Sequence, residues 1–94
     1  MNCKEAYDKM FSILDEQYIW TRERGLEVLL DDMDPFFFVG GTSAYPAIYN
    51  NFVEHWQQSQ DALETAVWLV TKYAKQYDYD GEEAADYLKI HWQD

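Results

Sequence analysis

The sequence predicts a compact, all-α single domain of about five helices over residues 1–94. Apolar residues recur every three or four positions along most of the chain, which is the spacing of amphipathic helices. Almost no segment alternates as a strand does, and the apolar stretch 36–39 is too short to pair with another. Of the 94 residues, 48% are hydrophobic and 18% aromatic, so the chain has room for one well-filled core.

The first half of the chain is predicted to form two helices. The longer one covers about 4–20, and its apolar residues share one face: Tyr7, Met10, Phe11, Leu14 and Tyr18. The charged segment 21–25 ends this helix, with basic residues near its C-terminus and Gly25 just beyond. The shorter helix, 26–33, is expected to bury Leu26, Leu29, Leu30 and Met33. It ends at Asp34, because a residue before proline is pushed out of helical geometry.

The second half is predicted to form three helices. Pro46 is typical of a first turn, and the helix it begins carries one apolar face: Ile48, Tyr49, Phe52, Val53 and Trp56. Ser59 is expected to cap the fourth helix, which has a longer apolar stripe: Leu63, Ala66, Val67, Val70, Tyr73, Ala74 and Tyr77. Asp80, with Glu83 three residues later, predicts the start of a last helix. That helix contains Ala84, Leu88 and His91 or Trp92.

The charge balance indicates the kind of partner. The net charge is -11, from 18 acidic and 7 basic residues, and the pI is about 4.3. Such a surface repels the phosphates of nucleic acids and anionic lipids, and it favours partners with basic surfaces. Proteins that handle nucleic acids are the commonest of these. Plain solubility is the alternative explanation of the charge.

The sequence also indicates a compartment. A single cysteine, Cys3, cannot form an internal disulfide, so nothing requires an oxidising environment. The N-terminal residues lack the long apolar run of a signal peptide. The longest apolar run, 66–70, is far shorter than a membrane span. We therefore expect a cytoplasmic protein.

No pattern predicts catalysis, a metal or a cofactor. The two histidines, His55 and His91, fall in different helices, and with Cys3 they do not make a zinc spacing. The acidic run 31–34 lacks the glycine and distal glutamate of a calcium loop. The glycine pair at 40–41 lacks the further glycine and the lysine of a phosphate-binding loop. We expect no enzyme.

Helix packing does not explain two aromatic features, the position of Trp68 and the run of three phenylalanines at 36–38. Trp68 points nearly opposite to the stripe of the fourth helix, beside charged residues, so either a neighbouring segment covers it or it is an exposed interface anchor. Three consecutive phenylalanines, 36–38, lie between acids and a glycine pair. They cannot all face inward, so at least one should be partly exposed.

Four successive segments suggest a family: KEAYDKMFSILDEQY, TRERG, LEVLLDDM and GGTSAYPAIYNNFVEHW. Over about residues 4–56 the chain resembles small acidic bacterial immunity proteins of contact-dependent growth inhibition and related polymorphic toxin systems. The resemblance implies a cytoplasmic protein that neutralises one cognate toxin, often a nuclease with a basic active-site surface. Family members often have an acid just before the loop proline. This chain has Tyr45 there, which makes Tyr45 itself a candidate contact.

The sequence therefore predicts an immunity protein that covers the basic active-site surface of a cognate toxin, most simply a nuclease. The predicted partner-binding residues are Asp31, Asp32, Asp34, Phe37, Tyr45, Trp68, Glu82, Glu83 and Asp86. Two other interpretations stay open: an acidic nucleic-acid mimic that inhibits a defence or restriction protein, and a helical adaptor or structural subunit without inhibitory activity. Neither nucleic acid nor a membrane is an expected partner, and the oligomeric state is left open.

Overall fold

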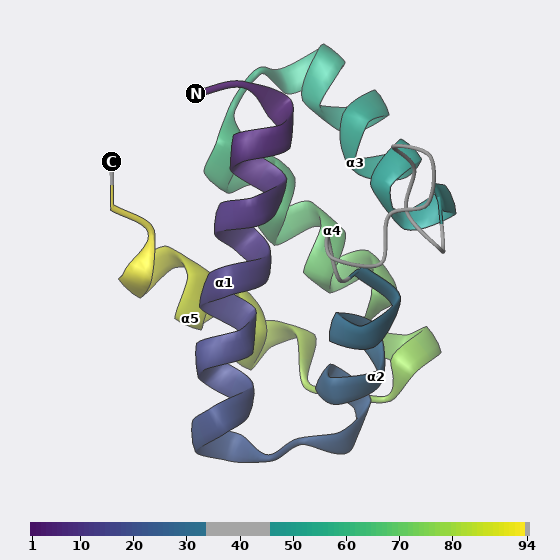
Figure 1. The fold of residues 1–94 in the computed structure, drawn as a ribbon, viewed down its shortest axis with the longest axis vertical. Coiled ribbons are helices and arrows are strands. Elements are labelled where there is room, and N and C mark those ends of the chain that lie inside the picture. The colour runs from purple at the N-terminus through teal and green to yellow at the C-terminus, as the bar shows by residue number, and fades with distance from the viewer. Residues whose placement is uncertain (34–45, 94) are drawn as a thin grey trace.

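The chain folds into helices, in agreement with the predicted all-α class. The computed structural model describes residues 1–33 and 46–93, and within these ranges it contains helices and no strand. In chain order the helices are α1 (Cys3–Thr21), α2 (Arg24–Met33), α3 (Pro46–Ser59), α4 (Ala62–Tyr77) and α5 (Gly81–His91) (Figure 1). The segment 34–45, with its three phenylalanines, lies outside the described residues.

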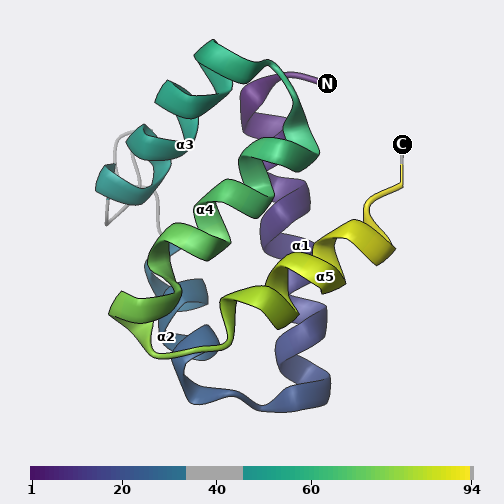
Figure 2. The same cartoon turned by 180° about the vertical axis from the view of Figure 1, so that it is seen from behind.

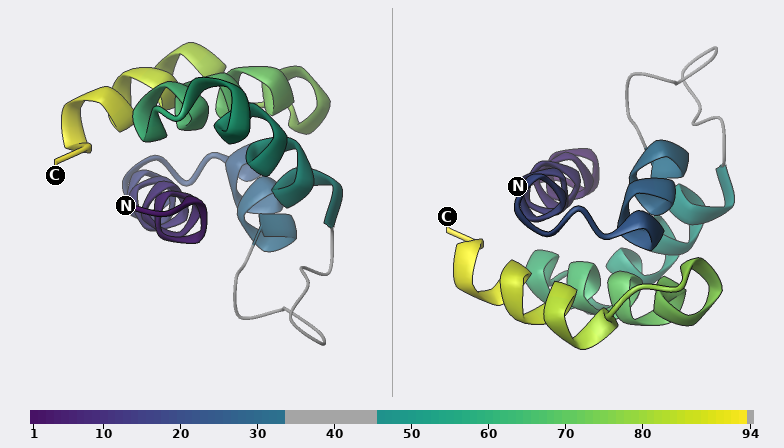
Figure 3. Two further views of the ribbon diagram at one scale, coloured as in Figure 1. Left: turned by 90° about the horizontal axis from the view of Figure 1, so that it is seen from above. Right: turned by 90° about the horizontal axis from the view of Figure 1, so that it is seen from below.

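The helices form two layers (Figure 3). Helices α1 and α2 lie side by side in one layer, and α4 and α5 form the other. Helix α3 runs across one end, where it contacts α1, α2 and α4 (Figures 1 and 2). The radius of gyration is 12.1 Å, close to the value of roughly 12 Å expected for a compact domain of this length. The two layers and α3 therefore enclose one core between them.

Tyr7 of α1 lies at the centre of this core. Its ring is fully buried and meets the rings of Tyr49 and Phe52 on α3 edge-on, at centroid distances of 4.9 and 5.3 Å. Its hydroxyl donates to the carbonyl oxygen of Met33 at the end of α2, at 3.3 Å. One side chain thus joins three helices, and the polar end of the tyrosine keeps a partner after burial.

The predicted apolar faces are largely the buried faces. All four apolar residues expected in the second helix are buried. In α4 the buried residues include two that the predicted stripe omits, Leu69 and Thr65. In α1 the apolar stripe is joined by Gln17, a polar residue that is only 1% exposed.

Two residues do not mark the helix ends predicted for them. Helix α1 ends at Thr21, close to the predicted bound, but the residue that caps it is Arg22, which adopts the left-handed conformation with φ of 56°. Gly25 is not a terminating glycine and lies buried inside α2. Ser59 is the last residue of α3 rather than the cap of α4. Asp61 caps α4 instead, since its carboxylate accepts from the backbone N–H of Glu64 at 3.0 Å. The predicted cap at Asp80 is confirmed, at 3.0 Å from the backbone nitrogen of Glu83.

The end of α3 offers a test of this backbone geometry. Gln60 is exposed, has φ of 54°, and donates its backbone N–H to the carbonyl of Trp56 at 2.8 Å. Glycine adopts this conformation without the steric cost that a side chain incurs. We expect Gln60→Gly to raise the free energy of unfolding by about 0.5–1 kcal/mol, measured by urea denaturation. The matched variant Gln57→Gly, inside α3, should lower it by about 1 kcal/mol. Equal destabilisation by both would contradict the left-handed cap.

In the described part of the chain, none of the helices has the length and apolar character needed to cross a membrane.

Candidate functional site

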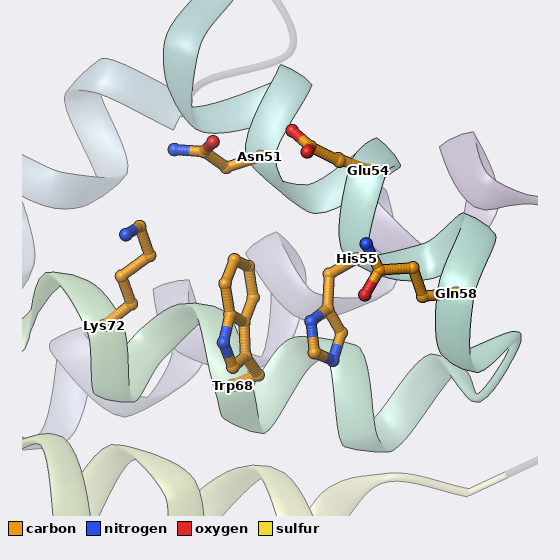
Figure 4. Close-up of a pocket in the computed structure, with 6 residues that line it drawn as sticks. All are labelled: Asn51, Glu54, His55, Gln58, Trp68 and Lys72. Carbon is orange, nitrogen blue, oxygen red and sulfur yellow. The ribbon is translucent and has the colours of Figure 1, made fainter.

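Trp68, the aromatic residue that the sequence analysis singles out, is half-buried on α4. Its indole stacks on the imidazole of His55 from α3, with ring centroids 4.2 Å apart and planes inclined by 11°. The ammonium of Lys72 lies 5.7 Å from the centroid of the indole. Figure 4 shows the tryptophan between these two residues. Trp68 is therefore part of the contact between two helices, with one portion of its surface open.

An open pocket of about 190 Å³ lies beside this stack (Figure 4). It is lined by Asn51, Glu54, His55 and Gln58 from α3 and by Trp68 and Lys72 from α4. A second open hollow shares the last two residues and adds Glu64, Val67 and Thr71. We refer to the two hollows together as the α3–α4 groove.

Helical spacing explains why these residues meet. On α3 the lining residues are separated by three or four positions, so they share one face, and on α4 the residues 64, 68 and 72 do the same. Two side-chain contacts join the faces. His55 Nε2 lies 2.7 Å from Glu64 Oε2, and the amide nitrogen of Asn51 donates to the hydroxyl of Tyr73 at 2.6 Å. The groove is thus held by both helices rather than by a loop.

The groove combines a flat aromatic ring with charges of both signs. Glu54 and Glu64 supply carboxylates, and Lys72 supplies an ammonium. Such a surface is suited to recognise a charged or planar side chain of a partner protein.

Cys3, on α1, does not line the groove. Its partial burial raises the pKa of the thiol, which disfavours the reactive thiolate.

The predicted acidic residues are divided between two helices. Asp31 is exposed near the end of α2, whereas Asp32 is partly buried and accepts a hydrogen bond from the hydroxyl of Tyr77 at 2.5 Å. Glu82, Glu83 and Asp86 are all exposed on α5. Asp32 therefore has a structural contact, and the other four carboxylates are accessible to a partner.

Three further predicted contacts lie outside the described residues: Asp34, Phe37 and Tyr45. They remain predictions from the sequence.

With this geometry established, the chain can be compared with known proteins. No protein-family model, curated protein or solved structure matches it. The resemblance to immunity proteins thus stays a prediction made from short motifs. Among the residues that the structure describes, no three His, Cys, Asp or Glu side chains are placed to hold a metal ion.

The sequence analysis did not identify Trp20, which has the largest exposed fraction among the exposed large hydrophobic side chains of the described residues. Trp20, at the end of α1, is 77% exposed, and its neighbour Ile19 is 53% exposed. The signal was present in the helical spacing, because neither residue falls on the apolar stripe that ends with Tyr18. Two large apolar side chains on the outer face of a helix are candidates for a partner contact.

Proposed function

We propose that this protein is a cytoplasmic immunity protein, which binds a cognate toxin domain and neutralises it by covering a basic active-site surface. The observation that carries the proposal is the placement of the acids. Most of the acidic residues in the described chain are exposed on a rigid helical frame, and the chain as a whole has a net charge of -11. Such a surface attracts basic proteins over a distance and repels nucleic acids. Nuclease toxins fit this charge, since their active sites bind phosphates.

The first experiment identifies the partner and measures inhibition. The tagged full chain is used to capture proteins from its host, and each captured protein is then purified and assayed with added inhibitor. We expect a basic protein whose activity is lost at one equivalent, and whose toxicity in cells is relieved by co-expression. Release of the partner by competing DNA would favour a nucleic-acid mimic instead. Tight binding without any loss of activity would favour an adaptor.

A charge-reversal experiment tests the role of the acids. Asp31 and Asp86 suit it, because both are exposed and neither lies in the first turn of a helix, where an acid stabilises the helix dipole. We expect Asp31→Lys with Asp86→Lys to slow association with the partner by about tenfold at low salt and to flatten its salt dependence. Dissociation should change by less than about twofold, since charges at the rim act mainly on the encounter.

Stopped-flow kinetics at several salt concentrations measure both rates. The neutral pair Asp31→Asn and Asp86→Asn is the control, and it should give a smaller effect in the same direction. If the lysine pair leaves the association rate unchanged at low salt, the acidity serves solubility alone.

A further inference from the structure

On α1, the other described helices leave two consecutive apolar residues exposed, Ile19 and Trp20. Among the described residues, the exposed large hydrophobic side chains are Met1, Ile19, Trp20, Val28 and Ile90. Single exposed apolar residues are normal on protein surfaces. Ile19 and Trp20 differ because they are adjacent in the chain and lie on the same helix. Trp20 also presents the ring type that most often dominates binding at interfaces.

Two acids precede this pair by one helical turn. Asp15 lies four positions before Ile19, and Glu16 lies four positions before Trp20, so each acid is the neighbour of one apolar residue on the helix surface, and the two pairs lie about 100° apart around α1. All four are exposed. An apolar centre with carboxylates beside it is complementary to an apolar socket with lysine or arginine at its edge.

Exposed acids also lie on α5, the helix that packs against α1. Partial burial, followed by the charge of Glu16, raises the pKa of the Tyr87 hydroxyl on α5. Asp86, one of the predicted partner contacts, precedes Tyr87 and is exposed. Exposed acids of both helices therefore contribute to the negative charge around the packed pair α1 and α5.

The α3–α4 groove is a weaker candidate for the anchor. Trp68 is already half-buried and stacked on His55, so a partner would gain less apolar contact there than at Trp20. A second copy of this chain is also a poor occupant of the α1 face. It would bring a second net charge of -11 against the first and set like carboxylates near one another.

We propose that Asp15, Glu16, Ile19 and Trp20 form the docking surface for a basic protein partner, with Trp20 inserted into an apolar socket and the two acids paired with lysine or arginine at its rim. This inference rests on the proposed function. It assigns the main binding residue for the partner, Trp20, to α1.

A defined probe tests the surface before any partner is known. The probe is a short amphipathic helical peptide of leucine and lysine, added to the isotope-labelled full chain, and oligolysine is the charge-only control. The four tryptophans each give a separate indole N–H signal in the nitrogen–proton spectrum. We expect the amphipathic peptide to shift the Trp20 indole and the amides of residues 15–20 in a saturable manner. Oligolysine should give small shifts spread over all acidic surfaces.

Three outcomes would contradict the proposed docking surface. These are saturable shifts at the Trp68 indole instead, shifts with no preference among the indoles, and a Trp20 signal that moves with protein concentration alone, which would indicate self-association.

The partner captured in the host provides the second arm. Trp20→Ala should weaken its binding by at least about 30-fold. Ile90→Ala is the matched control, because Ile90 is 70% exposed but lies near the end of α5. That end is beside the other half of α1, where Lys9 donates to the backbone oxygen of Gln93. The control should change binding by less than about threefold, as expected outside an anchor.

The two proposals fail in different ways. Full inhibition of a toxin by the Trp20→Ala variant would leave the function standing and overturn the docking surface. A partner that needs Trp20 for binding but loses no activity would leave the surface standing and overturn the function.

Discussion

Replacing Gly25 by alanine is expected to destabilise the fold severely. A Cβ atom at this position would lie 2.3 Å from the backbone oxygens of both Tyr77 and Asp78. Real Cβ atoms do not approach other atoms this closely, so the end of α4 or the start of α2 would have to move. Overpacking lowers the free energy of unfolding by about 1–3 kcal/mol, and by about 3 kcal/mol or more when backbone must shift. We expect a loss of that size in urea denaturation, with a Tm lowered by more than about 10 °C.

The neighbouring variant Arg24→Ala is the control, because Arg24 is exposed on the same turn of α2. It should change the free energy of unfolding by less than about 0.5 kcal/mol. The opposite result is clear as well. Glycine inside an unobstructed helix is less stable than alanine by about 1 kcal/mol. A stabilised Gly25→Ala protein would therefore show that α2 and α4 do not meet at this glycine.

Replacing Gln17 by methionine is expected to stabilise the protein. Gln17 is 1% exposed, and within the described residues neither its amide nitrogen nor its amide oxygen has a hydrogen-bond partner. Burying unpaired polar atoms costs about 1–3 kcal/mol. Methionine has a similar length and an equally good helix propensity, so it removes that cost with little change in packing. We expect the free energy of unfolding to rise by about 1–2 kcal/mol, which raises Tm by roughly 5–10 °C.

Two variants accompany this measurement. Gln76→Met, at an exposed position of α4, should be neutral to within about 0.5 kcal/mol. Gln17→Glu should lower stability by about 3 kcal/mol or more at neutral pH, because it buries an unpaired charge. If Gln17→Met lowers stability instead, the amide makes hydrogen bonds in solution that the structure lacks.

The polar identity of Gln17 hides its burial from sequence reasoning. Helical spacing places it on the same side as Leu14, yet a glutamine in this register is usually taken as the edge of the apolar face. The same limit applies to Gly25. Its position after a basic segment predicts a helix end, while its actual role is set by a carbonyl pair more than fifty positions later in the chain.

Trp68 and Trp20 illustrate this limit for the candidate site. The spacing within α4 predicts correctly that Trp68 leaves the apolar stripe, but only the position of α3 decides that His55 covers part of it. For Trp20 the spacing places the side chain off the apolar stripe, but only the packing of the described helices decides that it stays 77% exposed.

By itself, the sequence determined the helical class, the approximate helix bounds and most of the buried faces, because these depend on contacts within a few residues. The charge of the surface also follows from composition alone. Only the tertiary structure decided which polar or small residues enter the core, which acids are held by structural contacts, and which tryptophan is left exposed. Those outcomes depend on how α1 to α5 lie against one another, and such contacts join residues that are distant in the chain.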